Sequence, residues 1–126
     1  MSEPTRTIAG EKYRTALEIK PDRHEALYNW GAALMERAKA KSDRESEALY
    51  RAAAEKLSRA EALAPGRGAY NLACLAALQG RGDEARSWLV KSRDAGDLPD
   101  RAHLEQDTDL DWIRDAEWFR ELLSGL

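Results

Sequence analysis

The sequence predicts an all-α protein of antiparallel helix hairpins, and two observations carry that prediction. Alanine occurs 22 times, whereas the β-branched residues valine and isoleucine occur once and three times, a balance that favours helices over strands. Prolines also close successive helical segments, since Pro65 and Pro99 are 34 residues apart and Pro21 precedes Pro65 by 44, the same period plus ten residues. A recurring period of this size is typical of helical repeats. At 126 residues, the chain is expected to form a single domain, 1–126.

The first helix is expected over about residues 7–20, and Pro21 ends it. Ile8, Tyr13 and Leu17 fall on one side of this helix. Because no helix precedes it, residues 7–21 are interpreted as half a repeat. The apolar side of this helix is then expected to be buried against a partner protein or a second copy of the chain.

The next helix is expected to open at Asp22, whose side chain can cap the helix N-terminus. Its apolar residues follow helical spacing and form one core-facing stripe, with a glycine where a crossing helix needs space. The stripe consists of Leu27, Trp30, Gly31, Leu34 and Ala38.

Ser42 and Glu45 predict a capping box at the start of the returning helix, which runs to Pro65. Residues 22–65 form an extended repeat with ten more residues than the 34-residue period. These are expected to lengthen both helices and leave a short turn near residues 41–42. The basic residues expected to be exposed at the tip are Arg37, Lys39, Lys41 and Arg44.

Residues 66–99 form a repeat of standard length. A short helix is predicted from Tyr70 to Gln79, where Gly80 ends it, and Asp83 begins its partner helix. Residues 100–126 predict three short amphipathic pieces, interpreted as an irregular helical cap over the last repeat. The large apolar residues of this cap are Leu110, Trp112, Ile113, Trp118, Phe119, Leu122 and Leu123.

Charge and composition exclude several classes of function. The formal net charge is −3 with both signs interleaved, which is typical of a solvated helical surface and disfavours nucleic acid as a partner. Charged residues interrupt the apolar stretches, so no membrane span is expected. The single cysteine cannot form an internal disulfide, and the first six residues hold no apolar signal sequence. A cytoplasmic location is therefore expected.

The residues capable of nucleophilic or acid–base chemistry form no catalytic pattern. His24 lacks the second histidine that a zinc-protease helix needs, and both it and His103 are expected at the surface. Cys74 has no base marked beside it and is interpreted as a packing or groove-lining residue. The sequence therefore predicts a protein that is not an enzyme and has no cofactor.

Four aspartates of the C-terminal segment follow the spacing of a calcium-binding loop. Trp112 and Trp118, however, occupy the positions where that loop requires glycine and glutamate. Helix capping and solubility explain the acids better, so no metal site is predicted. The four residues are Asp107, Asp109, Asp111 and Asp115.

Two stretches of the chain repeat each other. Leu27-Tyr28-Asn29-Trp30-Gly31 is echoed by Ala69-Tyr70-Asn71-Leu72-Ala73, and both hairpins end at a proline. Over roughly residues 9–96 this pattern resembles the tetratricopeptide repeat. The resemblance implies a tetratricopeptide superhelix of about two and a half repeats, similar to the C-terminal repeats and end cap of bacterial members of that family.

The resemblance also implies a function. In this family the first helices of successive repeats line a concave groove that holds an extended peptide or a partner helix, so a non-catalytic protein–protein interaction scaffold is expected. Tyrosine and asparagine suit the recognition of a peptide, although they can equally serve to stabilise helix stacking. The corresponding groove residues here are Glu25, Tyr28, Asn29, Ala32, Met35, Glu36, Arg67, Tyr70, Asn71, Cys74, Ala77 and Leu78.

Two other functions stay open at this point: self-assembly into a homodimer through the first helix, and service as a regulatory subdomain of a larger protein. One type of ligand is disfavoured, because the lysine and asparagine clamp that holds chaperone C-terminal tails in some family members is missing. The clamp positions are taken here by Tyr28, Ala32, Tyr70 and Cys74.

Overall fold

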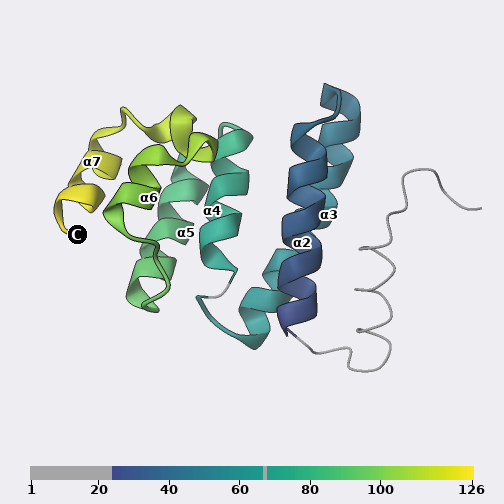
Figure 1. The fold of residues 1–126 in the computed structure, drawn as a ribbon, viewed down its shortest axis with the longest axis horizontal. Coiled ribbons are helices and arrows are strands. Elements are labelled where there is room, and N and C mark those ends of the chain that lie inside the picture. Colours follow the sequence, from purple (N-terminus) through teal and green to yellow (C-terminus); the bar gives the residue numbers. More distant parts are fainter. Residues whose placement is uncertain (1–23, 67) are drawn as a thin grey trace, which may run out of the picture. The chain divides into compact units, whose positions relative to one another are not determined.

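The computed structural model describes residues 24–66 and 68–126. Within these residues the chain is all-α, as predicted, with no strand (Figure 1). The predicted helix over residues 7–20 and the N-cap at Asp22 lie outside the described residues. The helices are α2 (His24–Lys39), α3 (Asp43–Leu63), α4 (Ala69–Leu78), α5 (Gly82–Asp94), α6 (Arg101–Gln106), the 3-10 helix η1 (Thr108–Ile113) and α7 (Glu117–Ser124).

The chain divides into two compact units, one ending at Gly68 and the other comprising Ala69–Leu126. Each unit contains one packed helix pair, α2 with α3 in the first and α4 with α5 in the second. None of the helices in the described part of the chain is long and apolar enough to cross a membrane.

The first unit is a hairpin whose two helices approach most closely at Gly31. A Cβ atom on this residue would lie 2.6 Å from Cγ of Leu57 and 3.3 Å from the carbonyl oxygen of Ala53. Leu27 and Leu57 are fully buried beside this crossing, whereas Trp30 is half-buried beneath the Lys56 ammonium, 4.3 Å from its ring centroid. The predicted role of the glycine, to make room for a crossing helix, is confirmed.

The turn between α2 and α3 is short, because α2 ends at Lys39 and α3 begins at Asp43. The ten extra residues of this hairpin lengthen its helices, as predicted: α2 and α3 have 16 and 21 residues, whereas α4 and α5 have 10 and 13. Lys39, Lys41 and Arg44 are exposed at the tip. Arg37 is half-buried, so the prediction that it would be exposed is wrong.

The side chain that closes this turn is Ser46 and not Ser42. Ser42 stands at the N-cap of α3, but its side chain makes no capping hydrogen bond, so the predicted capping box with Glu45 is wrong. The Ser46 hydroxyl is instead in hydrogen-bonding contact with two backbone carbonyl oxygens. The Ala38 oxygen lies at 2.5 Å from it and the Lys41 oxygen at 3.0 Å. Ser46 thereby serves the end of α2, where carbonyl groups lack the usual intrahelical partner.

The segment after α3 is held by a buried carboxylate that the sequence did not single out. Glu61 is 7% exposed, and its two oxygens accept the backbone N–H groups of Gly66 and Gly68 at 2.8 and 3.1 Å. Gly66 has a φ of 96°, a conformation that glycine adopts without strain. Hydrogen bonds from backbone N–H groups satisfy a carboxylate that would otherwise be costly to bury.

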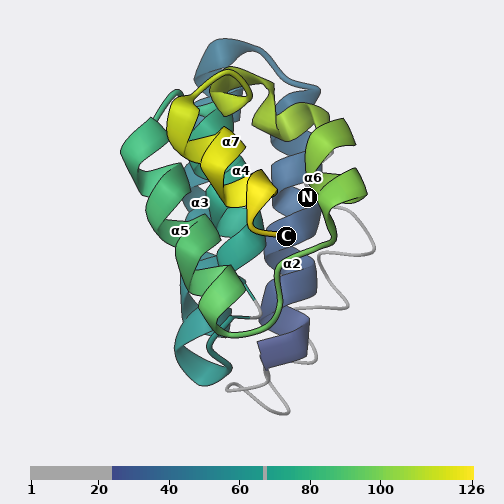
Figure 2. The same cartoon turned by 90° about the vertical axis from the view of Figure 1, so that its left-hand side faces the viewer.

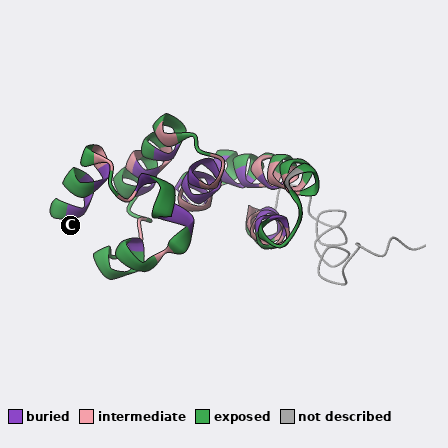
Figure 3. Ribbon diagram, turned by 90° about the horizontal axis from the view of Figure 1, so that it is seen from above, coloured by how far each residue is buried: buried purple, intermediate pink, exposed green. Residues whose placement is uncertain are grey.

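In the second unit, α4 is short and buried along most of its length (Figure 3). Gly80 ends it with a φ of 74°, and the N–H of Arg81 returns to the carbonyl of Ala76 at 2.8 Å, as the predicted glycine stop requires. The partner helix α5 begins at Gly82, one residue before the predicted start. Its residues Ala85 and Leu89 are fully buried.

The C-terminal segment forms three short helices, α6, η1 and α7, as predicted, and they lie beside the α4–α5 hairpin (Figures 1 and 2). Leu104, Leu110 and Phe119 supply one fully buried side chain from each piece. Trp112 is 74% exposed, so its predicted place in the apolar cap is wrong. The Trp118 side chain is half-buried and lies on Arg86 of α5, 5.8 Å from the guanidinium carbon to the ring centroid.

Arg114 fastens α6 to η1. Its guanidinium donates to the backbone carbonyl oxygens of Leu104 at 3.3 Å, of Glu105, and of Asp107 at 2.7 Å. These carbonyls belong to the end of α6 and the junction that follows it. The guanidinium thus donates to carbonyl oxygens at the C-terminus of α6 that have no partner within the helix. Such contacts stabilise a helix that is too short to be stable by itself.

The crossing at Gly31 predicts the outcome of a glycine exchange. Gly31→Ala should lower the free energy of unfolding by about 1–3 kcal/mol, because the added methyl group would lie 2.6 Å from Cγ of the fully buried Leu57 and 3.3 Å from the Ala53 carbonyl oxygen. Gly82→Ala is the matched control: a Cβ there meets nothing within 4 Å, so it should raise the stability by about 0.4–1 kcal/mol. Urea denaturation followed by circular dichroism measures both, and equal stabilities for the two variants would contradict the close crossing.

Candidate functional site

In the second unit, polar side chains converge on Asp107. This residue ends α6 and also caps the N-terminus of η1, where its Oδ1 atom accepts the backbone N–H of Asp109 at 3.0 Å. Helix α4 packs against η1, so the Asp107 carboxylate faces side chains of α4. The predicted capping role of this aspartate is confirmed.

Helix α4 contributes Tyr70 and Cys74, which are one helical turn apart and therefore on one face. The Tyr70 hydroxyl donates a short hydrogen bond to Oδ2 of Asp107. The Cys74 thiol donates to the same oxygen, with 3.8 Å between sulfur and oxygen. Both donors point at one carboxylate, and this joins α4 to the start of η1.

His103 of α6 completes the cluster on its more exposed side. Its Nε2 atom lies 3.5 Å from Oδ2 of Asp107, and the imidazole side chain is 55% exposed. Its ring meets that of Tyr70 edge to face, with 5.6 Å between the centroids. The expectation that His103 lies at the surface is confirmed, but the residue also faces the cluster.

The environment keeps Tyr70 and Cys74 protonated at neutral pH. Burial, and then the neighbouring Cys74 and Asp107, raise the pKa of the Tyr70 hydroxyl far above its usual range. Burial and the negative charge of Asp107 likewise raise the pKa of the Cys74 thiol. A thiol held in its protonated form is a poor nucleophile, so this environment favours a packing or binding role for Cys74 over a catalytic one.

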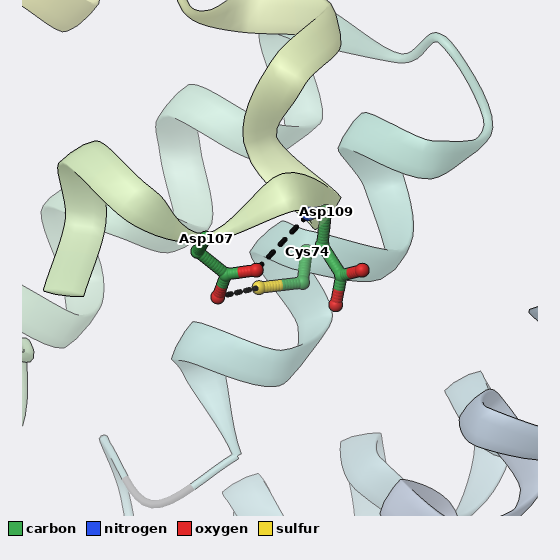
Figure 4. Close-up of side chains that lie close together, drawn as sticks. All are labelled: Cys74, Asp107 and Asp109. Atoms are coloured by element: carbon green, nitrogen blue, oxygen red, sulfur yellow. Dashed lines mark hydrogen bonds between the residues drawn. The ribbon is translucent and has the colours of Figure 1, made fainter.

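Cys74, Asp107 and Asp109 lie close together, and the Cys74 sulfur points toward the Asp107 carboxylate (Figure 4). The sulfur and one oxygen from each carboxylate lie within 4.8 Å of one another. Cys74 is 1% exposed and Asp109 is 9% exposed, which differs from the solvent-facing role that the sequence suggested for this acid. No spacing motif could have revealed the cluster, because 33 residues separate Cys74 from Asp107.

The groove residues predicted on α2 differ in exposure. Tyr28 and Ala32 are half-buried, and Met35 is 4% exposed and thus part of the core. The residues that face solvent are Glu25, Asn29 and Glu36.

The groove residues predicted on α4 are mostly covered. Cys74 and Ala77 are buried, and the tyrosine hydroxyl is bonded to Asp107. Arg67 lies outside the described residues. The α2 and α4 residues belong to different units, so a groove shared by them stays a prediction. The half-buried residues of this set are Tyr70, Asn71 and Leu78.

No protein-family model matches the chain, and neither the curated proteins nor the solved structures contain a match to it. The tetratricopeptide resemblance therefore rests on the sequence pattern, and the fold is established at the level of packed helix pairs.

The convergence on Asp107 predicts a large effect of removing its carboxylate. Asp107→Ala should lower the free energy of unfolding by about 2–4 kcal/mol, because the Tyr70 hydroxyl and the Asp109 N–H lose their acceptor in a partly buried place. Asp115→Ala removes a carboxylate that is 98% exposed and should stay within about 0.5 kcal/mol of the wild type. Urea denaturation compares the two, and an equally small effect of both exchanges would show that the Asp107 hydrogen bonds do not stabilise the fold.

Proposed function

We propose that this protein is a non-catalytic protein–protein interaction scaffold of the tetratricopeptide type, and that α2 provides the face that binds a peptide or a partner helix. The observation that carries the proposal is the exposure pattern of α2. Glu25, Asn29 and Glu36 face solvent along the helix, whereas its opposite face is buried against α3. The amide of Asn29 can donate and accept hydrogen bonds, and the carboxylates of Glu25 and Glu36 can accept them. This helix face can therefore bind the backbone of a peptide.

The second unit supports the idea that this helix face can receive another segment. Tyr70 and Cys74 of α4 correspond to Tyr28 and Ala32 of α2 in the repeated sequence. On α4 these positions are in contact with the start of η1 through Asp107. The chain therefore contains one example of a helical segment seated on this face by a tyrosine–carboxylate hydrogen bond.

The packing of the two hairpins supports the repeat part of the proposal. Gly31 of α2 and Ala73 of α4 occupy corresponding places in the repeated sequence, and both small residues are buried. Small residues at such places allow two helices to approach closely. A superhelix of about two and a half repeats would need this feature in each hairpin.

Self-assembly is the second candidate, and the exposure of Trp112 favours it. This side chain is 74% exposed on η1, and large exposed aromatic residues are frequent anchors of protein interfaces. A dimer in light scattering that becomes a monomer after Trp112→Ala would support self-assembly over the binding of another protein.

The scaffold proposal is tested with the two asparagines of the repeated stretches. Partners captured from cells by the wild-type protein are identified, and their affinities are measured with Asn29→Ala/Asn71→Ala. The double variant should bind about 5- to 150-fold more weakly, equivalent to about 1–3 kcal/mol, because it removes the amide of Asn29 from the proposed α2 face and the corresponding amide of α4.

The matched control is Gln106→Ala, which removes an exposed amide from α6 and should leave the affinity unchanged. Circular dichroism must show equal helicity for all variants. Undiminished binding by the double variant would contradict the assignment of the partner site to these helix faces.

A further inference from the structure

The cluster of Cys74, Asp107 and Asp109 brings together donors that are chemically suited to a metal ion. The three side chains come from α4, from the junction of α6 with η1, and from η1 itself. The sulfur and one oxygen of each carboxylate lie within 4.8 Å of one another (Figure 4). His103 adds an imidazole nitrogen 3.5 Å from the nearer oxygen of Asp107. The cluster thus offers a thiol, two carboxylates and an imidazole from three elements of one compact unit.

We propose that this cluster is a binding site for one divalent cation of the zinc class, with Cys74, Asp107 and Asp109 as ligands and His103 as the fourth. The proposal is independent of the proposed scaffold function. A sulfur donor together with an imidazole suits zinc and cobalt, whereas magnesium and calcium prefer shells made of oxygen atoms.

Two of the distances between the proposed ligand atoms are close to those of a tetrahedral site. With zinc–sulfur bonds near 2.3 Å and zinc–oxygen bonds near 2.0–2.2 Å, neighbouring ligand atoms are about 3.3–3.6 Å apart. Here Oδ2 of Asp107 lies 3.8 Å from the Cys74 sulfur and 3.5 Å from Nε2 of His103. These two distances are near those between neighbouring zinc ligands, and binding would also have to draw the Asp109 carboxylate oxygen, which lies within 4.8 Å of the sulfur, closer to it.

The charges of the cluster also favour a cation. The Asp107 side chain is 17% exposed and Asp109 is 9% exposed, so two neighbouring carboxylates are largely withdrawn from water. Two like charges in such a place repel each other, and a divalent cation between them offsets this repulsion. On binding, the cation takes the place of the Cys74 thiol proton, which leaves to solvent, and the thiolate sulfur becomes the ligand.

The groups around the cluster are those that orient metal ligands. The Tyr70 hydroxyl and the backbone N–H of Asp109 donate to the two oxygens of Asp107. The Arg114 guanidinium donates to the Asp107 carbonyl oxygen at 2.7 Å and holds that part of the backbone. Hydrogen bonds of this kind fix the orientation of ligating side chains. A bound cation would therefore fasten η1 to α4.

The first test uses the intact protein, reduced and freed of metal by a chelator. Titration with Co²⁺ should produce the near-ultraviolet charge-transfer absorption of a thiolate–cobalt bond, saturating at one equivalent, and Zn²⁺ should remove it by displacement. The absence of this absorption at saturating Co²⁺ would overturn the proposal, because Cys74 is the one cysteine of the chain.

The second test measures Zn²⁺ affinity by calorimetry in single variants. Asp109→Asn, which keeps the side-chain shape, and Cys74→Ser should each weaken binding by at least about 10- to 100-fold. Asp115→Asn removes a fully solvated carboxylate of the same segment and should bind as the wild type does. Equal Zn²⁺ affinity in the wild type and Asp109→Asn would overturn the site, and this comparison holds even where Cys74→Ser fails to fold.

Discussion

The hydrogen bonds to the Asp107 carboxylate are the constraint on which the second unit depends. One oxygen caps η1 through the N–H of Asp109, and the other accepts from Tyr70 and Cys74 of α4. Helices α6, η1 and α7 have six to eight residues each, and isolated helices of that length are not stable in water. Their position beside α4 therefore has to be fixed by contacts with the rest of the unit, and Asp107 supplies hydrogen bonds of this kind to α4.

The helices of the two units are held together by different kinds of contact. In the first, two long helices cross at Gly31, and apolar packing around Leu57 dominates. In the second, polar contacts of the partly buried Asp107 and Arg114 hold the short helices in place. On α4 the face that carries Tyr70 and Cys74 is occupied by the start of η1, whereas on α2 Glu25, Asn29 and Glu36 face solvent, which is why the proposed partner surface lies on α2. Polar anchors are costly to break, because each leaves an unsatisfied donor or acceptor away from water.

The elements could be predicted from the sequence because their signals are local. Gly80 ends α4, and the apolar spacing around Gly31 places the crossing correctly. The features that the sequence does not predict depend on contacts between residues far apart in the chain, or on which of two similar side chains makes a hydrogen bond. Ser46 replaces Ser42 as the side chain that closes the turn, and the Cys74–Asp107 contact spans 33 residues. Hydrophobicity alone places Trp112 in the cap, although this side chain faces solvent.

The most direct test of the central role of Asp107 is the alkylation rate of Cys74, which is 1% exposed beside that carboxylate. The native protein should react on the order of 100-fold more slowly, or slower still, than the protein in urea, because the thiol is reached only when the segment around η1 opens. Asp107→Ala should increase the native rate while leaving the rate in urea unchanged. A native rate that equals the rate in urea, or one that Asp107→Ala does not change, would contradict this account.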